Sequence, residues 1–348
     1  MNSFLNVLSN IPCDEISVYC TGYPEEGFMK AYQKNKPIYF EDSKYILHDK
    51  NYQIIKKLGF DAISLWDYRK GKEGGFKIDA KSNVDSWGRI YKNGWYTWDG
   101  IFKDEKILLD WTHLRLPSQQ DLTELNSFLQ SNLDQIAFVL SLPGLFEKTW
   151  QSIGFVTFSK FLKTGKLELI KRVIKFFSEY NARLIRRLQD SGASLFLFAD
   201  DCGYRNREFI PKDLWKSLFF NSYCHLVKSI HDKNQKVIIH SDGFISNYLE
   251  TFIEIGFDAV QSLEPSAGVD IFELFQQYGQ KICFIGNLDI SLLIYGTTPQ
   301  IRDYTTHLIR KAEESNARLI ISPTQQINSK VKIENIKAMI SAAKNFKV

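Results

Sequence analysis

Eight short apolar runs lie along the chain, and most of them end in small or polar residues. They are residues 17–20, 62–66, 137–142, 194–199, 236–239, 259–263, 281–285 and 317–321. Continuous apolar runs of this length are typical of parallel strands that are buried on both faces. Stretches suited to helices separate the later runs, at 211–233, 245–255, 271–278 and 298–315. The pattern therefore predicts repeated strand–helix–strand units.

Eight parallel strands are the number that closes a (β/α)8, or TIM, barrel. We therefore expect an α/β fold with one such barrel domain over residues 1–348. Segment 70–111 breaks the strand–helix rhythm, and a hairpin is predicted within it at 89–95. Because loops of this length usually form lids or binding loops, we expect this excursion to cover the barrel mouth. The segment contains four tryptophans, Trp87, Trp95, Trp98 and Trp111. They either form the wall of a site for a large flat ligand or pack the excursion against the barrel.

Composition narrows the class of protein only a little. Hydrophobic residues make up 44% and charged residues 24%, which is ordinary for a globular protein. The net charge is only +4, and no basic block carries interleaved aromatic residues, so we expect no nucleic-acid partner. We find neither a signal-peptide pattern nor a long uncharged apolar run, so we expect no membrane segment. The five cysteines lack CxxC spacing and suggest free thiols and a cytoplasmic location.

Polar side chains follow the apolar runs, where a barrel carries its active site. Those that could act on a ligand are Trp66, Asp200, Asp201, His240, Asp242, Glu264, Asn287 and Gln325. Several carboxylates and a histidine at one mouth are costly unless they are paired or bound to something. The clustering predicts an enzyme that acts on a small molecule. We expect catalytic roles for His240, Asp201 and Glu264, and substrate contacts from the remaining polar or aromatic positions, Asp200, Trp66, Asn287 and Gln325.

His240 and Asp242 stand two positions apart at the end of one run. In extended backbone their side chains point to the same side, so they could share one metal ion or one substrate group. Alternatively, His240 hydrogen-bonds a loop carbonyl and Asp242 forms an Asx turn onto Gly243. The carboxylates of Asp201 and Glu264, expected at the same mouth, favour the first hypothesis.

Asp200 and Asp201 are adjacent, so only one of them can face the barrel axis. We favour Asp201, which leaves Asp200 as a cap, an outer pair or a substrate contact. Two acids in a shared pocket would raise the pKa of one of them, which suits proton transfer. For Glu264 the alternative is a salt bridge to a loop lysine.

The block HSDGFISNYLETFIEIGFDAVQSLEPSAGVDIFELFQQYGQKICFIGNLDI, residues 240–290, carries a family pattern. Shorter matching segments lie at 85–92, 142–155, 198–217 and 322–340. Together they closely resemble the uroporphyrinogen-decarboxylase-like superfamily, which also contains cobamide-dependent methyltransferases. The resemblance covers essentially the whole chain and implies a (β/α)8 barrel, in agreement with the eight runs.

The subfamily patterns are only partly present. Uroporphyrinogen decarboxylases are metal-free and carry an arginine after the first strand, where this chain has YCTGYPEEGF (19–28). The methyltransferases hold zinc with a His-x-Cys pair and a second cysteine. Here the pair is His240 and Asp242, and the second cysteine position falls on or near Gln325. The resemblance therefore implies a site of His240, Asp242 and Glu264 with nitrogen and oxygen ligands, which could still hold zinc.

The favoured function is cobamide-linked transfer of a methyl group from a small ether, amine or thiol. Since no DxHxxG motif is present, the corrinoid would arrive on a separate partner protein. One alternative is a decarboxylase or other lyase that uses Asp201 beside a developing charge. Another is a non-catalytic ligand-binding barrel, which the missing thiolates support. Barrels of this superfamily often dimerise, so a homodimer is a further expectation.

Overall fold

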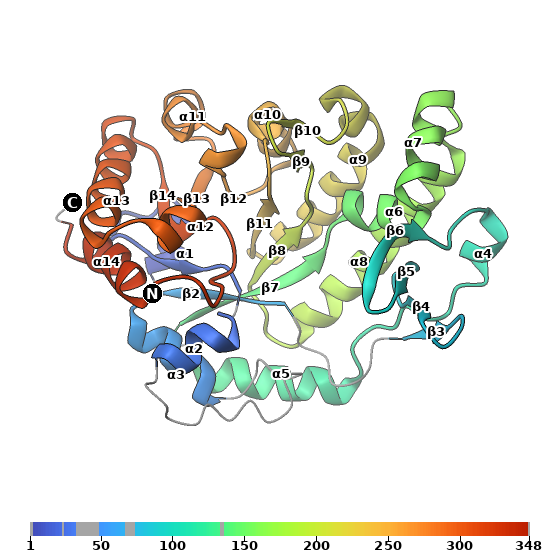
Figure 1. Ribbon diagram of the computed structural model, residues 1–348, viewed down its shortest axis with the longest axis horizontal. Helices are drawn as coiled ribbons and strands as arrows, with labels where there is room; N and C mark the ends of the chain where they lie inside the picture. Colours follow the sequence, from blue (N-terminus) through green and yellow to red (C-terminus); the bar gives the residue numbers. More distant parts are fainter. Residues whose placement is uncertain (1–2, 23, 33–48, 67–73, 133–135, 347–348) are drawn as a thin grey trace.

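The computed structural model describes residues 3–22, 24–32, 49–66, 74–132 and 136–346. Eight parallel strands form its main sheet: β1 (Tyr19–Cys20), β2 (Ala62–Leu65), β7 (Ala137–Pro143), β8 (Leu195–Ala199), β11 (Lys236–Ser241), β12 (Ala259–Ser262), β13 (Cys283–Leu288) and β14 (Leu319–Pro323). Their spatial order follows the chain order. The barrel closes where Val18 bridges Ile321 beside β1 and β14. Each predicted run overlaps one strand, so the predicted (β/α)8 barrel is confirmed (Figure 1).

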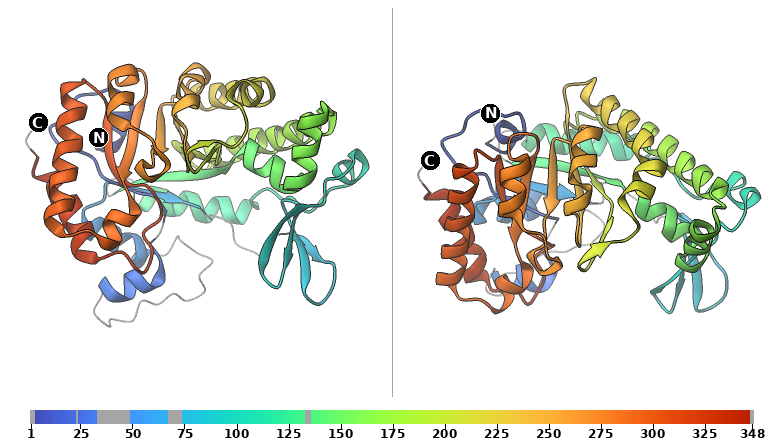
Figure 2. Two further views of the ribbon diagram at one scale, coloured as in Figure 1. Left: turned by 45° about the horizontal axis from the view of Figure 1, so that its top comes forward. Right: turned by 90° about the horizontal axis from the view of Figure 1, so that it is seen from above.

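Helices surround this barrel and connect its strands (Figures 1 and 2). They are α2 (Glu26–Tyr32), α3 (Asp49–Leu58), α5 (Gln119–Asn132), α6 (Leu145–Ile153), α7 (Phe155–Thr164), α8 (Glu168–Asp190), α9 (Lys212–His231), α10 (Leu249–Ile255), α11 (Ile271–Tyr278), α12 (Ile290–Tyr295), α13 (Thr298–Glu314) and α14 (Ile333–Lys344). The four helices predicted after residue 210 are all present. None of the helices in the described ranges is long and apolar enough to cross a bilayer.

Two apolar clusters explain why the strands appear as continuous apolar runs. One lies inside the barrel, where Leu197 and Ile238 pack with the short helix α1 (Ser3–Leu8). The other lies between the strands and the helices, where Phe196 and Phe198 are fully buried. Alternate side chains of one strand therefore enter different cores, and neither face needs polar residues. All five cysteines are free, as predicted.

The excursion forms an antiparallel sheet of β3 (Gly75–Lys77), β4 (Ser82–Asp85), β5 (Arg89–Lys92) and β6 (Trp95–Gly100), followed by α4 (Glu105–Leu109). The predicted hairpin is its β5–β6 pair. This sheet lies beside the barrel against α6 and α7, not across the mouth as expected (Figure 1). Trp87 and Arg89, at its inner edge, line a cavity of about 250 Å³ next to Trp66.

Close backbone contact holds β6 on the helices. A Cβ at Gly100 would lie 2.1 Å from the carbonyl oxygen of Ser152 at the end of α6, so only glycine fits. Lys103 reinforces the contact by donating to the carbonyl of Ile153 at 2.6 Å. The excursion is therefore anchored at the α6–α7 junction.

Candidate functional site

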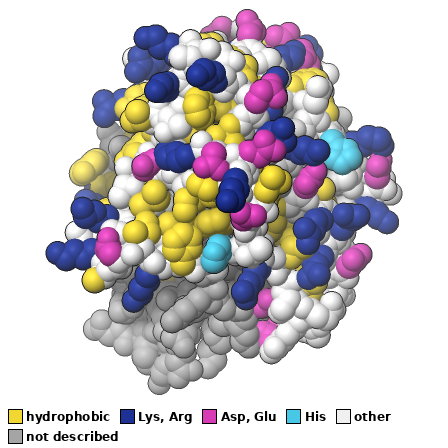
Figure 3. Space-filling view, turned by 90° about the vertical axis from the view of Figure 1, so that its right-hand side faces the viewer, with side chains coloured by type: hydrophobic (Ala, Val, Ile, Leu, Met, Phe, Trp, Pro, Cys, Tyr) yellow, Lys and Arg dark blue, Asp and Glu magenta, His cyan; other side chains and the backbone are white. Residues whose placement is uncertain are grey.

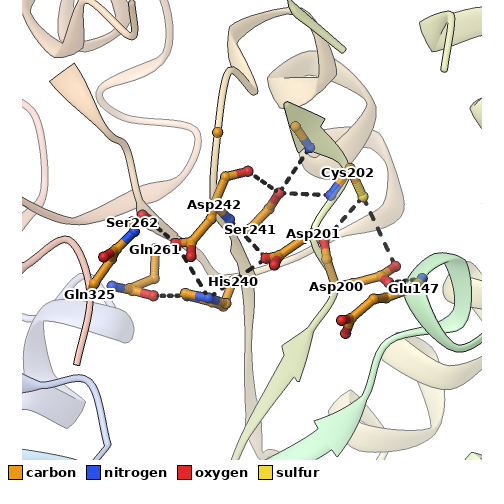
Figure 4. Close-up of polar contacts among 12 residues, drawn as sticks. Glu147, Asp200, Asp201, Cys202, His240, Ser241, Asp242, Gln261, Ser262 and Gln325 are labelled. Atoms are coloured by element: carbon orange, nitrogen blue, oxygen red, sulfur yellow. Dashed lines mark hydrogen bonds and ion pairs between the residues drawn. The ribbon is translucent and has the colours of Figure 1, made fainter. Parts of the chain in front are cut away.

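Strand register brings three predicted residues together at the barrel mouth. His240 pairs with Ala199 of β8 on one side and with Gln261 of β12 on the other. Asp201 follows β8 and Asp242 follows β11, so their carboxylates meet at the end of these neighbouring strands (Figure 4). His240 Nε2 lies 3.9 Å from Asp201 Oδ1 and 3.7 Å from Asp242 Oδ1. One ligand atom from each of the three residues lies within 4.8 Å of the others.

Gln261 fixes the imidazole of His240. Its Nε2 donates to Thr21 Oγ1 at 3.0 Å and to the carbonyl of Thr324 at 3.2 Å. Its Oε1 therefore faces Nδ1 of His240 and accepts a hydrogen bond from it. With Nδ1 protonated, the neutral ring directs the lone pair of Nε2 toward the two carboxylates. Such an arrangement is unfavourable unless a proton or a cation lies between them.

The three groups hold protons more tightly than isolated side chains do. Burial and the nearby charge of Asp242 raise the pKa of Asp201 to about 6. Burial also raises the pKa of Asp242, against the opposing effect of His240. Burial by itself would lower the pKa of His240, but Asp242 and Asp201 outweigh it, and the pKa is raised. The cluster therefore attracts positive charge, either as protons or as a metal ion.

The donor set of this cluster fits a divalent cation. One imidazole nitrogen and two carboxylate oxygens are ligands that zinc and similar ions accept. Each ligand is also oriented by an outer partner: Ser262 Oγ donates to Asp242 Oδ1 at 3.0 Å, and the Asp242 amide donates to Asp201 Oδ1 at 2.9 Å. Two ligands of one zinc ion lie roughly 3.3 Å apart. The two distances from His240 Nε2 are only slightly larger, and rotations of the carboxylate side chains would bring all three groups around one ion.

Glu264 does not belong to this cluster, although it lines the same cavity. Its Oε2 accepts from the Gly243 amide at 2.7 Å, and its Oε1 accepts from Gln325 Nε2 at 2.8 Å. The structure therefore places Asp201, rather than Glu264, as the third group beside His240 and Asp242. Glu264 and Gln325 together connect the loops that follow β11 and β14. Chemical roles for these two side chains stay predictions.

Two predicted substrate contacts lie away from the cavity. Asp200 is fully buried, and its carboxylate accepts from the Phe146 and Glu147 amides at 3.1 and 2.6 Å and from the Tyr223 hydroxyl. Burial raises its pKa to about 7, against the effect of these hydrogen bonds. Asn287 is buried as well, between the Leu263 carbonyl and the Tyr304 hydroxyl. Both side chains support the strand ends, so their prediction as substrate contacts needs correction.

Trp66 lies at the mouth as predicted. Its ring meets His240 edge to face, with centroids 5.9 Å apart, and 38% of the residue surface is exposed. Gly22 permits this position, because a Cβ there would lie 2.4 Å from the indole nitrogen. The indole therefore bounds one side of the cluster.

A cavity of about 600 Å³ opens above Asp201, Asp242 and Glu264. Its outer wall is the hairpin of β9 (Gly203–Tyr204) and β10 (Arg207–Glu208), with Arg205 and Asn206 at the tip. A cavity of this size suits a small molecule. The site thus combines three groups able to hold a cation with room for a substrate beside them.

A comparison with protein families and a comparison with solved structures each find proteins that are similar to this barrel. Residues 150–346 match the family model described as uroporphyrinogen decarboxylase (URO-D). The fold is similar to that of a methyltransferase from Methanosarcina mazei, with a TM-score of 0.68 and 14% identity over 98% of this chain and 96% of that one. It is also similar to a B12-independent methionine synthase from Shewanella sp. W3-18-1, with a TM-score of 0.54 and 12% identity over 94% and 97%.

At 12–14% sequence identity, the similarity to these two solved structures shows only that they share the fold of this chain. A comparison with curated proteins finds no match. The family model, however, covers more than half of the chain and includes β8 to β14, the strands whose ends carry Asp201, His240 and Asp242. The protein therefore belongs to the uroporphyrinogen decarboxylase family, as the sequence pattern predicted.

Proposed function

We propose that this protein is a metal-dependent methyltransferase that moves a methyl group between a small methylated substrate and a corrinoid on a separate protein. The observation that carries the proposal is the Asp201–His240–Asp242 cluster at the barrel mouth, in which Nε2 of His240 faces two carboxylates. A bound divalent cation would act there as a Lewis acid on the heteroatom that carries the methyl group.

The chain's own residues supply the remaining chemistry. When the methyl group leaves, the bonding electrons stay on the heteroatom, which then gains a proton. Asp201 would be a ligand of the cation and therefore deprotonated, so the carboxyl group left to pass that proton is Glu264, which lines the same cavity outside the cluster. Trp66 excludes water from one side of His240. The cavity above leaves space for a small ether, amine or thiol.

Decarboxylation of a small carboxylic acid is the second candidate. Asp201 favours it, since a carboxyl group with a pKa of about 6 also suits protonation of the carbanion left by carbon dioxide. This chemistry needs no metal in the cluster. Metal content therefore separates the two functions.

The test is metal content by plasma mass spectrometry after zinc supplementation and dialysis. We expect about one metal ion per chain in the wild type and a loss in His240→Ala. His231→Ala is the matched control, because His231 also contacts a carboxylate, that of Asp258 at 2.9 Å, but lies on the outer helix α9. Assays with methylated donors and cob(I)alamin follow. Absence of metal from all three proteins contradicts the methyltransferase proposal and favours decarboxylation.

A further inference from the structure

The cavity of about 250 Å³ that Trp87 and Arg89 line lies at the same end of the barrel as the metal cluster. It is enclosed by the ends of β7 and β8, the start of α6, one face of α8 and the excursion. Two cationic side chains face it, Arg89 from β5 and Lys148 from α6. We call this cavity the basic compartment.

The basic compartment adjoins His240. Trp66 lines it, and the ring centroids of Trp66 and His240 lie 5.9 Å apart. Ala199 lines it as well and is the residue of β8 that pairs with His240 of β11. Backbones of paired strands lie about 4.8 Å apart. A group bound in the compartment is therefore separated from the imidazole by no more than one side chain.

A carboxylate that does not line the compartment orients Arg89. Asp85 accepts from the amides of Trp87 and Arg89 at 3.0 and 2.9 Å and from Nε of Arg89 at 2.6 Å. The two amide bonds hold the carboxylate on the backbone, so the third bond fixes the direction of the guanidinium. At its outer end, Nη1 makes one long bond, of 3.3 Å to Gln151 Oε1. Since a guanidinium has five N–H donors, several remain at this end for a ligand.

Lys148 is a buried ammonium with only distant partners among the described residues. Its side chain is 13% exposed. Its Nζ lies 3.3 Å from Glu147 Oε2 and 3.4 Å from Gln151 Oε1, beyond the usual range of a hydrogen bond, and 5.8 Å from the centre of the Trp87 ring. Lysines are rarely buried unless they are paired, because the ammonium loses its hydration. An anion in the compartment would supply a short, charge-assisted hydrogen bond to this group.

The lining of the compartment suits a single carboxylate. Two cations and one carboxylate, that of Glu147, line it, so one further negative charge balances the lining. The planar fork of a guanidinium also matches the geometry of a carboxylate. The volume is below the roughly 300–1,000 Å³ of complete small-molecule sites and fits an acid group with a few carbon atoms.

The surroundings also favour the approach of an anion. The chain has a net charge of +4, and Figure 3 shows Lys and Arg side chains spread over the side of the molecule that carries the excursion. Surface charge of one sign raises the local concentration of ligands of the opposite sign.

We propose that the basic compartment binds the carboxylate of a small substrate, with Arg89 and Lys148 as its two anchors. This inference rests on the active site proposed above, but not on which reaction takes place there. With its carboxylate in the compartment, the ligand extends past Trp66 toward His240. The substrate class is then a small carboxylic acid whose reacting group lies a few carbon atoms from the acid. The excursion supplies Arg89 and thereby selects the ligand.

The test compares two probes that differ in charge but hardly in shape. They are 3-methoxypropanoate and 3-methoxypropanamide, and their binding is measured by ligand-observed NMR titration. We expect the carboxylate to bind the wild type about tenfold tighter than the amide, and Arg89→Gln to remove that preference. Arg172→Gln is the matched control and should keep it, because Arg172 also pairs with a carboxylate, that of Glu105 at 2.7 Å, but does not line the compartment.

Several outcomes overturn the assignment. They are equal binding of the two probes to the wild type, no binding of either, and a preference that survives Arg89→Gln. A preference lost in Arg205→Gln but kept in Arg89→Gln would assign the carboxylate to the larger cavity, which Arg205 lines. If Arg89→Gln does not fold, Lys148→Met tests the second anchor and should also remove the preference.

The variant His240→Ala separates this proposal from the proposed function. Charge preference in His240→Ala, together with no metal uptake by the wild type, retains the basic compartment and rejects the metal-dependent function. Metal uptake by the wild type without charge preference retains the metal site alone. A preference lost in His240→Ala but kept in Arg89→Gln would place the carboxylate on the metal ion and overturn the assignment.

Discussion

Gln261 is a polar side chain in the middle of a buried strand. It is fully buried, and its amide contacts His240, Thr21 and Thr324. A buried amide is tolerated because its donors and acceptor are satisfied. The same bonds determine which nitrogen of His240 faces the carboxylates. We therefore regard Gln261 as a positioning residue for the metal ligand.

Gln261→Leu should weaken metal binding about 10- to 100-fold, as loss of an outer partner of a ligating histidine commonly does. It should also release His240 from the form protonated on Nδ1, which ¹⁵N chemical shifts report directly. Gln189→Leu is the control, since this glutamine donates to the Ser229 carbonyl away from the mouth. An unchanged metal affinity together with an unchanged tautomer would show that Gln261 only fills space.

The sequence located His240 and Asp242 at one site, because spacing by two along a strand is visible in the chain. Contacts between strands are not visible in this way. The approach of Asp201 to His240 depends on the register of β8 against β11, which is why Glu264 was named as a metal ligand in its place. Gln261 lies inside the run 259–263, whereas the barrel fold predicts site residues just after the runs. A single polar residue within a buried run is the signal that could have found it.

At the scale of elements, the contact of β6 with the α6–α7 junction holds the excursion against the barrel. It joins Trp98 on β6 to Trp150 and Phe155 on the two helices. The excursion sheet is otherwise largely exposed, and β3 is exposed at all three positions. Its placement therefore relies on a few close contacts rather than on a large core.

Gly100→Ala should detach β6 and lower the free energy of unfolding by at least about 2 kcal/mol, because the added Cβ overlaps a backbone carbonyl that cannot rotate away. Gly94→Ala is the comparison. Its added Cβ meets nothing within 4 Å, but its φ of +81° is unfavourable for alanine, so a cost of about 1 kcal/mol is expected. Urea denaturation gives both values, and equal values would exclude the steric explanation.

The barrel was predictable from sequence because burial on both faces produces continuous apolar runs. The excursion was predictable only as far as one hairpin. Its strands have few buried positions, for example only Val84 and Asp85 in β4, so apolar periodicity is absent. Its location beside the mouth depends on the glycine contact at Ser152, which no periodic pattern reports. A cavity of about 500 Å³ between β6, α7 and the β9–β10 hairpin likewise combines residues from three distant segments of the chain.

The two ends of the whole molecule differ in their electrostatics. At the mouth, burial raises the pKa of Asp200, Asp201 and Asp242. At the opposite end, just before β12, Asp258 accepts from Lys236 and the Val237 amide at 2.8 and 2.9 Å and contacts His231. Burial would raise the pKa of Asp258, but these bonds outweigh it and lower the pKa. One end thus favours ligands that bring positive charge, while the other stabilises the fold.

Asp258→Asn should lower the free energy of unfolding at pH 7 by about 1–3 kcal/mol, because the Lys236 ammonium loses its charged partner. A carboxylate with a lowered pKa stabilises the folded state above its unfolded pKa of about 3.9, and this stabilisation is lost as the pH falls through the lower folded value. The part of the difference that comes from the lowered pKa of Asp258 should therefore shrink as the pH falls below about 4. Asp232→Asn, in an exposed pair with Lys228, should cost less than about 0.5 kcal/mol. Denaturation midpoints across this pH range check both expectations.

The closure of the barrel between β14 and β1 involves the same amide that orients His240. Gln261 donates to Thr21, which follows β1, and to Thr324, which follows β14. Among the described residues beside these strands, Val18 and Ile321 form a backbone bridge, with the Ile321 amide donating to Ser17. A ligand that orders His240 should therefore also stabilise this junction, because Gln261 contacts both, and an effect of this kind is reciprocal.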